Sequence, residues 1–593
     1  MTTEVDVLIV TDDFDGGFLD WTQQAVDRSF HLGEFVKVLR NTAWLGFNLN
    51  LTLAHREGTE NGFTLQQVKD RTGADVVNFR FDETFQVGGQ SKKISDFDII
   101  LFFSVTTFDI ADAAKQQLEV DAIARFMENG GGFFATGDHE DLGFPLCHQI
   151  PRVRSMRRWW GFPGPNGEPQ APLGTGETRH DTLQAGPDHV FQFEDQSDEI
   201  PQPIDINWYF AGIGVVGGYP ASFSLPHPLL CSPDGAIKWL PDHMHEGQCE
   251  VPDNLGGRTF ALDGKTVREY PDYSGAPLAP EVIARGTVIA GHTSPSLFGD
   301  HFNETNNTVG TQFGVIGTWD GHRVGKGRVA VDSTWHHFFN INLTGDQLLS
   351  DNLPADDQRL HGFYVLQNGQ RVPAAAYEKI RHYYRNLIYW LIPKPKLKPI
   401  WWGALAKIAV SGELKELTKG WLGQLKKANK GKLPANYTYT LSQADFDYWY
   451  KFGNVADAYF KSIRGACSKA HVREILYKPK IPWWEWVMDI GDPWDPVIKV
   501  RDPEINRFVR MGGFGLATRV DTILQAGVGA AVMLAAQAQA ASPRGITAEQ
   551  VRKLDEAWDR AADVVTEKAR ALMADGAKLG ARLDHAMTAK AKR

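Results

Sequence analysis

Short apolar runs, each followed at once by a polar turn, constrain the fold of this chain more than any other feature of its sequence. They cover residues 5–10, 97–104 and 133–136, and a helical pattern over 111–128 separates the last two. Apolar runs of this length are typical of buried strands. Strands that alternate with helices predict a parallel sheet with helices on both faces, which is an α/β fold.

The same reasoning extends to the rest of the first two-thirds of the chain. It predicts a helix over 111–128 with apolar positions Ala114, Leu118, Ala122 and Phe126, ended by the glycines of 129–132. We therefore expect a flavodoxin-like domain over residues 1–392, with a large loop-rich insertion at about 144–275. The further predicted elements are helices at 19–40 and 376–392 and strands at 75–80, 284–290, 312–316 and 328–332.

The charge of the chain is divided unevenly along its length. Residues 1–390 hold 29 basic and 51 acidic residues, whereas residues 391–593 hold 33 basic and 21 acidic ones. Sixteen of the eighteen histidines also lie in the first part. The acidic balance argues against nucleic acid as a partner, because phosphate contacts need Lys and Arg. We expect chemistry in the first part and association in the second; the alternative is that the two parts only attract each other.

The basic second part is predicted to be mainly helical. The sequence Pro393-Lys394-Pro395-Lys396 predicts a linker, followed by a Trp-rich region over 393–510. A capping-box pattern at 547–550 and the uncharged run 522–543 predict a buried helical hairpin within 511–593, through which copies of the chain could associate. Membrane association through 522–543 is the less favoured alternative, because few residues of the run are large and apolar.

The cysteine content and the N-terminus both bear on location. Four cysteines in 593 residues favour a reducing compartment over a disulfide scaffold. The first residues hold no basic region followed by a long apolar run, so we expect no signal peptide. Together these features predict a cytoplasmic protein.

Histidines and carboxylates follow the predicted strands. Asp138, His139 and Glu140 come after the strand at 133–136, and His336 comes after the strand at 328–332. Ligands of parallel sheets bind outside the C-terminal ends of the strands. A histidine beside carboxylates can act as a general acid or base, so we predict that these four residues are catalytic. The alternative for the turn at 137–141 is that its acids cap the next helix.

Other residues at the same edge are weaker candidates. We predict that Asp12, Asp13, His292 and His337 bind a substrate, because each follows a predicted strand. One histidine of the pair 336–337 should face the site, and the other could be an interior side chain.

A third group of residues has the spacing of a metal site. In Asp242-His243-Met244-His245-Glu246 the two imidazoles point the same way if the segment is extended. His243, His245 and Glu246 are therefore candidate ligands for a divalent metal ion. The favoured alternative is a hydrogen-bonded loop without metal.

Four arginines form the basic cluster of the acidic part. They could bind an anionic substrate group. We favour the other interpretation, in which they pair with acidic side chains. They are Arg152, Arg154, Arg157 and Arg158.

The glycine-rich and histidine-containing stretches resemble the class I glutamine amidotransferase-like superfamily, in its trehalose-utilisation (ThuA-like) branch. The resemblance covers residues 5–140 and 280–392 and depends on the triple glycine before 133–136 and on Gly325–Val331 leading to a histidine. It places Gly137 where the family's nucleophilic cysteine would be, and its late histidine near His336 or His337. Glutamine hydrolysis through a cysteinyl intermediate is therefore excluded, which leaves acid–base or metal chemistry.

Three functions remain open from the sequence. The favoured one is a hydrolase-like enzyme acting on a polar small molecule, with carbohydrates as a candidate class. The second is a non-enzymatic interaction protein with a degenerate core and an associating basic tail. The third and weakest is a thiol protease that would use His139 and Cys231. The chain has no P-loop, no G-x-G-x-x-G after the first strand and no G-x-S-x-G, which argues against phosphoryl transfer and the usual serine hydrolases.

Overall fold

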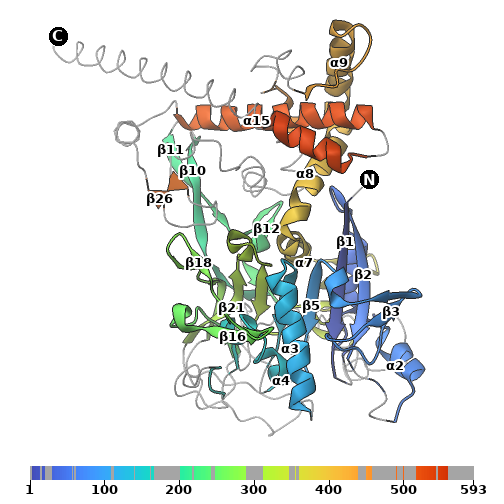
Figure 1. Cartoon of the computed structure of the whole chain (residues 1–593), viewed down its shortest axis with the longest axis vertical. Coiled ribbons are helices and arrows are strands. Elements are labelled where there is room, and N and C mark those ends of the chain that lie inside the picture. The colour runs from blue at the N-terminus through green and yellow to red at the C-terminus, as the bar shows by residue number, and fades with distance from the viewer. Residues whose placement is uncertain are drawn as a thin grey trace, which may run out of the picture.

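The fold is built around a ten-stranded mixed sheet (Figure 1). The structure is a computed structural model. It describes residues 3–456, apart from 14–15, 21–29, 57, 59–61, 108–111, 139–140, 160–161, 166–200, 217–218, 242–246, 289–310, 346–353, 356–359, 438–448, 450 and 454, together with 489–490, 498–499 and 516–558 apart from 543–544.

Five parallel strands form one half of the sheet. In spatial order they are β2 (Phe47–His55), β1 (Thr3–Thr11), β5 (Ile99–Phe103), β6 (Gly132–Thr136) and β22 (Val329–Asp332). Antiparallel strands continue the sheet beyond β22. They are β21 (Thr311–Trp319), β15 (Gly247–Cys249) and β7 (Arg157–Trp159), with β20 (Glu281–Val288) and β9 (Asp205–Ile206) branching from β21.

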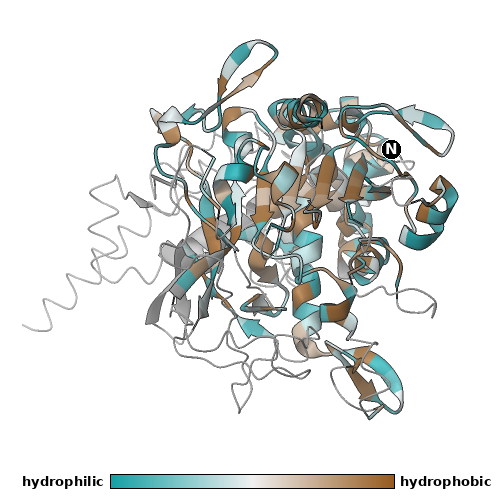
Figure 2. Cartoon of the chain, turned by 90° about the horizontal axis from the view of Figure 1, so that it is seen from below, coloured by the Kyte–Doolittle hydropathy of each residue, from teal (hydrophilic) through white to brown (hydrophobic). Residues whose placement is uncertain are grey.

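Helices cover both faces of the parallel half. Val7 and Ile9 of β1 share one hydrophobic cluster with helices α1 (Gly33–Arg40) and α7 (Ala375–Leu391). Leu8 of the same strand points the other way, into the cluster that contains α3 (Ala113–Glu128). Figure 2 shows the apolar strands enclosed between these helices. The α/β prediction is therefore confirmed, and the apolar runs are continuous because both faces of each strand are buried.

The remaining small elements surround this core. In the insertion, α4 (Phe144–Cys147) and α5 (Val153–Met156) precede short strand pairs, as the loop-rich composition predicted. These pairs are β14 (Trp239–Leu240) with β8 (Gln202–Pro203), β10 (Trp208–Val216) with β11 (Tyr219–Pro226), β12 (Cys231–Ser232) with β13 (Gly235–Ala236), β16 (Thr259–Leu262) with β17 (Lys265–Arg268), and β18 (Asp272–Tyr273) with β19 (Ala276–Pro277). Outside the insertion lie α2 (Leu65–Thr72), α6 (Asn340–Thr344), β3 (Phe85–Val87) with β4 (Gln90–Lys92), β23 (Tyr364–Gln367) with β24 (Gln370–Pro373), and β25 (Asp489–Ile490) with β26 (Ile498–Lys499).

Some predicted elements are wrong. The second strand is β2, whereas residues 75–80 contribute only an isolated bridge from Val76 to Ala54. The helix predicted over 19–40 begins only at Gly33, and the described residues before it are not helical. Strands β20 and β21 were predicted correctly, but they run antiparallel to their neighbours. Periodicity cannot give strand direction, because it records only which side chains are buried.

Helix α3 buries only part of the apolar row noted in the sequence. Phe126 is buried, but Leu118 is 54% exposed. Val120, Ile123 and Met127 are buried instead, together with Glu119, whose carboxylate pairs with Arg56 at 2.8 Å. The periodic pattern does not indicate this face because Glu119 is charged. A buried, paired carboxylate cannot be told from a surface residue in such a pattern.

The two glycine motifs singled out in the sequence contact each other. The N–H of Gly327 donates to the carbonyl of Met127 at 2.8 Å, just before β22. A Cβ added to Gly327 would lie 1.8 Å from the carbonyl oxygen of Gly131, which precedes β6. Only glycine allows the starts of these two strands to approach so closely.

A Gly327→Ala variant is therefore expected to lower the free energy of unfolding by about 2 kcal/mol, because backbone atoms must move to admit the methyl group. The thermal midpoint of the purified variant measures this. Gly256→Ala is the matched control, since its nearest neighbour, Pro277 Cγ, is 3.8 Å from the added Cβ. Equal midpoints for the two variants would contradict the expectation.

The basic second part is helical, but it does not begin with an extended linker. Helix α8 (Lys394–Ala409) starts directly after Pro393, because a proline in the first helical turn needs no hydrogen-bond partner for its nitrogen. Lys396 Nζ of α8 lies 2.6 Å from Asp98 Oδ2, at the start of β5. The helix is thus attached to the α/β part.

A second hydrophobic core joins α8 to the helices that follow. It contains buried residues of α9 (Gly412–Ala428), of α15 (Leu516–Ala541) and of the helical residues 548–558. The capping box is present, since Thr547 N donates to Gln550 Oε1 at 2.8 Å and Gln550 N donates to Thr547 Oγ at 3.2 Å. Within the segment predicted as a hairpin, the described residues 528–558 are mostly helical and contribute to this core. Among the described residues, no helix is long and apolar enough to cross a membrane.

Candidate functional site

The C-terminal ends of the five parallel strands form one level row. The register pairs Thr11 with Phe103, Phe103 with Thr136 and Thr136 with Asp332. His55 of β2 pairs with Thr11 at the outer end of the row. Polar residues one or two positions beyond these ends are therefore brought together, as expected of an open parallel sheet.

Asp138 and His336 form the central pair of the site. Asp138 follows β6 and His336 follows β22, and Asp138 Oδ2 lies 3.1 Å from His336 Nε2. Both side chains are buried, with exposed fractions of 1% and 0%. The two atoms are in close contact without the alignment of a hydrogen bond. Catalytic hydrogen bonds are often poorly aligned before a ligand binds.

Neighbouring side chains fix both partners. Thr334 Oγ donates to Asp138 Oδ1 at 2.7 Å, which leaves Oδ2 directed at the imidazole. Asn342 Oδ1 lies 3.0 Å from His336 Nδ1, and the indole of Trp335 stacks on the imidazole at 4.2 Å. If Asn342 Oδ1 accepts a hydrogen bond from Nδ1–H, the neutral imidazole presents an unprotonated Nε2 to Asp138, and a proton taken up by the pair would be shared between Nε2 and Oδ2. The arrangement can therefore hold and transfer one proton.

His337 takes part in a separate contact. Its Nδ1 lies 2.9 Å from Asp332 Oδ2, and the same oxygen accepts from Tyr383 Oη of α7 at 2.8 Å. Tyr384 Oη donates to the backbone carbonyl of His337 at 2.5 Å. All of these side chains are buried. His336 thus faces Asp138, and His337 faces the helix that closes the domain.

Arg157 lies near the carboxylates of Asp138 and Asp332. One nitrogen of its buried guanidinium donates to the backbone carbonyls of Asp138 at 3.1 Å and of Ser333 at 2.7 Å, and the group stacks over Trp159. Burial lowers the pKa of Arg157 from its ordinary value. Arginine nevertheless stays protonated in proteins, so its charge offsets that of the nearby carboxylates.

The Asp12 side chain, just after β1, contacts the residues that follow β5. The order of the strands in the sheet reverses between these two strands. Its carboxylate accepts from Ser104 Oγ at 2.6 Å and from the N–H groups of Val105 and Thr106 at 2.7 and 3.1 Å. Burial raises the pKa of Asp12, and this outweighs the opposing effects of Arg56 and of the hydrogen bonds. Asp13 lies half-buried in the turn that follows, with a φ of 67°.

The raised pKa has a consequence for stability. The folded state binds the Asp12 proton more tightly than the unfolded state does, so the contribution to stability is present at low pH and is lost as the pH rises through the folded pKa. Asn can keep all three hydrogen bonds without a charge. The thermal midpoint of Asp12→Asn, relative to the wild type, is therefore expected to rise between about pH 4 and pH 7. The exposed Asp234→Asn should show no such trend.

Three of the four clustered arginines pair with carboxylates, as favoured from the sequence, whereas Arg157 donates to backbone carbonyls. Arg152 contacts Glu128, Arg154 contacts Glu269, and Arg158 contacts Glu250 at 2.9 Å. The Arg152–Glu128 pair joins the insertion to α3, whereas the other two pairs lie within the insertion.

None of the cysteines described is an activated thiol. Cys147 and Cys249 are buried, and burial raises the pKa of each thiol well above its ordinary value. Cys231 is in a disulfide bond, so its sulfur is not available as the nucleophile of the thiol protease hypothesis. A Cβ at Gly137 would lie 2.6 Å from the Trp159 ring, so no side chain fits where the resemblance places the family's cysteine.

Several predicted site residues lie outside the part of the chain that the structure describes. They are His139, Glu140, His243, His245, Glu246 and His292. Among the residues that it does describe, no three His, Cys, Asp or Glu side chains form a metal-binding group. The structure thus unites Asp138 with His336 at one edge, with Asp12 at the neighbouring strand end.

A cavity of about 460 Å³ lies away from this edge, between α3, the segment after α4 and the β16–β17 hairpin. None of Asp12, Asp138 and His336 lines it. We place the candidate site at the strand ends because the paired acid–base groups are there, whereas the charged groups around the cavity, such as Arg154, already have partners.

Sequence reasoning missed several members of the site. Thr334 lies between the strand at 328–332 and His336, and Asn342 lies six residues after His336, but neither was singled out. Tyr383 lies in the aromatic helix, and Ser104 ends a predicted strand; nothing in their local sequence distinguishes them.

The chain was compared with models of known protein families, with curated protein sequences and with solved structures. None of the three comparisons found a match.

Proposed function

We propose that this protein is a hydrolase-like enzyme acting on a polar small molecule, with carbohydrates as the candidate class. The observation that carries the proposal is the 3.1 Å contact between Asp138 and His336, with Asn342 and Thr334 orienting the two groups. A buried carboxylate facing a histidine at a strand end is the kind of arrangement found at functional sites.

In the proposed reaction, the pair moves one proton. His336 or Asp138 takes a proton from water as the water attacks the substrate, and the proton is then returned to the leaving group. Arg157 supports the negative charge that remains on the carboxylates, because its guanidinium is buried next to them. No cysteine takes part.

We also propose that the α/β part belongs to the amidotransferase-like superfamily, in its ThuA-like branch, with a flavodoxin-like sheet. Numbered along the chain, the five parallel strands have the order 2-1-3-4-5, which supports this assignment. A divalent metal held by His243, His245 and Glu246 is a further part of the proposal, and elemental analysis of the purified protein tests it.

The test of the proposed activity uses the purified full-length chain and a panel of chromogenic glycosides, esters and amides. We expect turnover of at least one class by the wild type and loss of that turnover in His336→Gln. An exposed change, Arg268→Gln, serves as the control. Equal turnover by the wild type and His336→Gln would refute the proposal.

A second candidate function is a non-enzymatic scaffold that associates through its C-terminal helices. The near-complete burial of Asp138 and His336 favours it, because a substrate must reach catalytic groups. Cross-linking of the full chain would support this candidate if links join residues 394–558 of two copies and the panel shows no turnover.

A further inference from the structure

Helix α9 and its flanking segments carry an unusual concentration of one kind of charge. Residues 394–432 contain ten lysines, two glutamates and no arginine. Figure 1 shows α9 at one end of the molecule, beyond α8 and α15 and away from the sheet.

Three of these lysines form a single stripe on the exposed side of α9. Lys415, Lys419 and Lys426 are spaced by four and seven residues, which places them on one side of a helix. All three are exposed, whereas Leu414 and Trp421 are buried in the second core. The stripe is therefore open to a partner along its length.

The fold does not need this stripe. Like charges at positions i and i+4, as at Lys415 and Lys419, lower the stability of a helix, and the 2.7 Å pair of Lys419 with Glu416 offsets only part of that repulsion. Gly420 and Gly423 also lie in the helix interior, where glycine is unfavourable. A Cβ at either position would meet no atom within 4 Å, so packing does not require glycine there. Their small size leaves the face beside the lysines shallow.

The chemistry of the stripe indicates the kind of partner. Arginine is the residue suited to bidentate recognition of phosphates and bases, whereas lysine acts as a point charge. Lysine clusters on amphipathic helices bind anionic lipid headgroups. The acidic part of the chain, with 51 acidic and 29 basic residues, lies on the far side of α8, where an anionic surface would repel it least.

We propose that α9 docks the protein on an anionic lipid surface through Lys415, Lys419 and Lys426, without insertion. Charge complementarity carries the contact. The large apolar residues of α9 face the second core, and the exposed side beside the stripe offers glycines and glutamine rather than apolar side chains.

The test is flotation of the full-length protein with phosphatidylcholine vesicles, with and without about one-third phosphatidylserine. We expect binding only to the vesicles with phosphatidylserine, and loss of binding between about 0.1 and 1 M salt, where the screening length falls from about 10 to 3 Å. The triple variant K415Q/K419Q/K426Q should bind about 100-fold more weakly, since each lysine contributes independently near the surface. The control variant K93Q/K115Q/K265Q removes three exposed lysines of the α/β part and should bind as the wild type does.

Three results would overturn the proposal. The first is equal binding to vesicles with and without phosphatidylserine. The second is an equal loss of binding in the control variant. The third is tighter binding to duplex DNA than to the anionic vesicles at the same phosphate concentration, which would assign the stripe to nucleic acid instead.

Discussion

An Asp138→Asn variant is expected to lose roughly 100- to 10,000-fold of the hydrolytic rate, which is the range that a positioned general acid or base contributes. The amide keeps the size of the carboxylate and can accept the hydrogen bond from Thr334, but it cannot share a proton with His336. Steady-state rates of the purified variant measure the loss.

The control for this variant comes from the same turn. Asp141 is half-buried and lies three residues further on, outside the contacts between Asp138 and His336. Asp141→Asn should retain most of the activity. Equal loss in both variants would show that the turn, rather than the Asp138 carboxylate, is needed.

A variant at Asn342 separates a catalytic role from a structural one. In Asn342→Asp a carboxylate would face His336 Nδ1 and favour the imidazolium form. The limb of the pH–rate profile that reports the imidazole is therefore expected to move to higher pH. A purely structural role would lower the rate without moving the limb.

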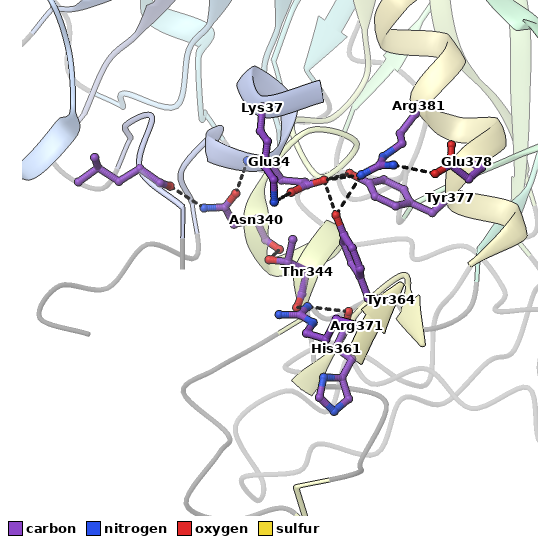
Figure 3. Close-up of polar contacts among 11 residues, drawn as sticks. Glu34, Lys37, Asn340, Thr344, His361, Tyr364, Arg371, Tyr377, Glu378 and Arg381 are labelled. Carbon is purple, nitrogen blue, oxygen red and sulfur yellow. Dashed lines mark hydrogen bonds and ion pairs between the residues drawn. The ribbon is translucent and has the colours of Figure 1, made fainter. Parts of the chain in front are cut away.

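The largest effect on stability is expected at Glu34 of α1. Its Oε1 accepts from Tyr364 Oη at 2.6 Å, from Tyr377 Oη at 3.0 Å and from an Arg381 nitrogen at 3.1 Å (Figure 3). The backbone N–H of Glu34 also donates to Asn340 Oδ1 at 2.9 Å. The buried carboxylate thus joins α1 to β23 and α7, and the backbone of the same residue joins α1 to α6.

Glu34→Gln is expected to lower the free energy of unfolding by about 3 kcal/mol, because it leaves a largely buried guanidinium without its buried counter-charge. Glu378→Gln is the matched control. Glu378 pairs with the same Arg381 at 2.7 Å, but its side chain is 52% exposed, so its loss should cost less than about 1 kcal/mol. Thermal midpoints of the two variants give the comparison, and a similar fall in both would refute the role assigned to burial.

Much of the fold could be predicted because the responsible signals are local. A run such as 97–104 is apolar on both faces wherever its neighbours lie, and Asn129 with three glycines ends α3. The prolines of Pro393–Lys396 led to the prediction of a linker where a helix begins. Proline disrupts the interior of a helix but is tolerated in its first turn. For α3 the apolar pattern indicated the helix but not its buried face, which Glu119 and Arg56 help to form.

The sequence by itself determined that strands end in acids and histidines and that these ends would share an edge, because parallel strands place their C-termini on one side. Only the tertiary structure decided which groups meet there. Asp138 and Thr334 are 196 residues apart, and Tyr383 comes from α7, a helix that does not follow any strand of this edge directly. Their contacts depend on the register of β6 against β22 and on the packing of α7, and no local pattern encodes either of these.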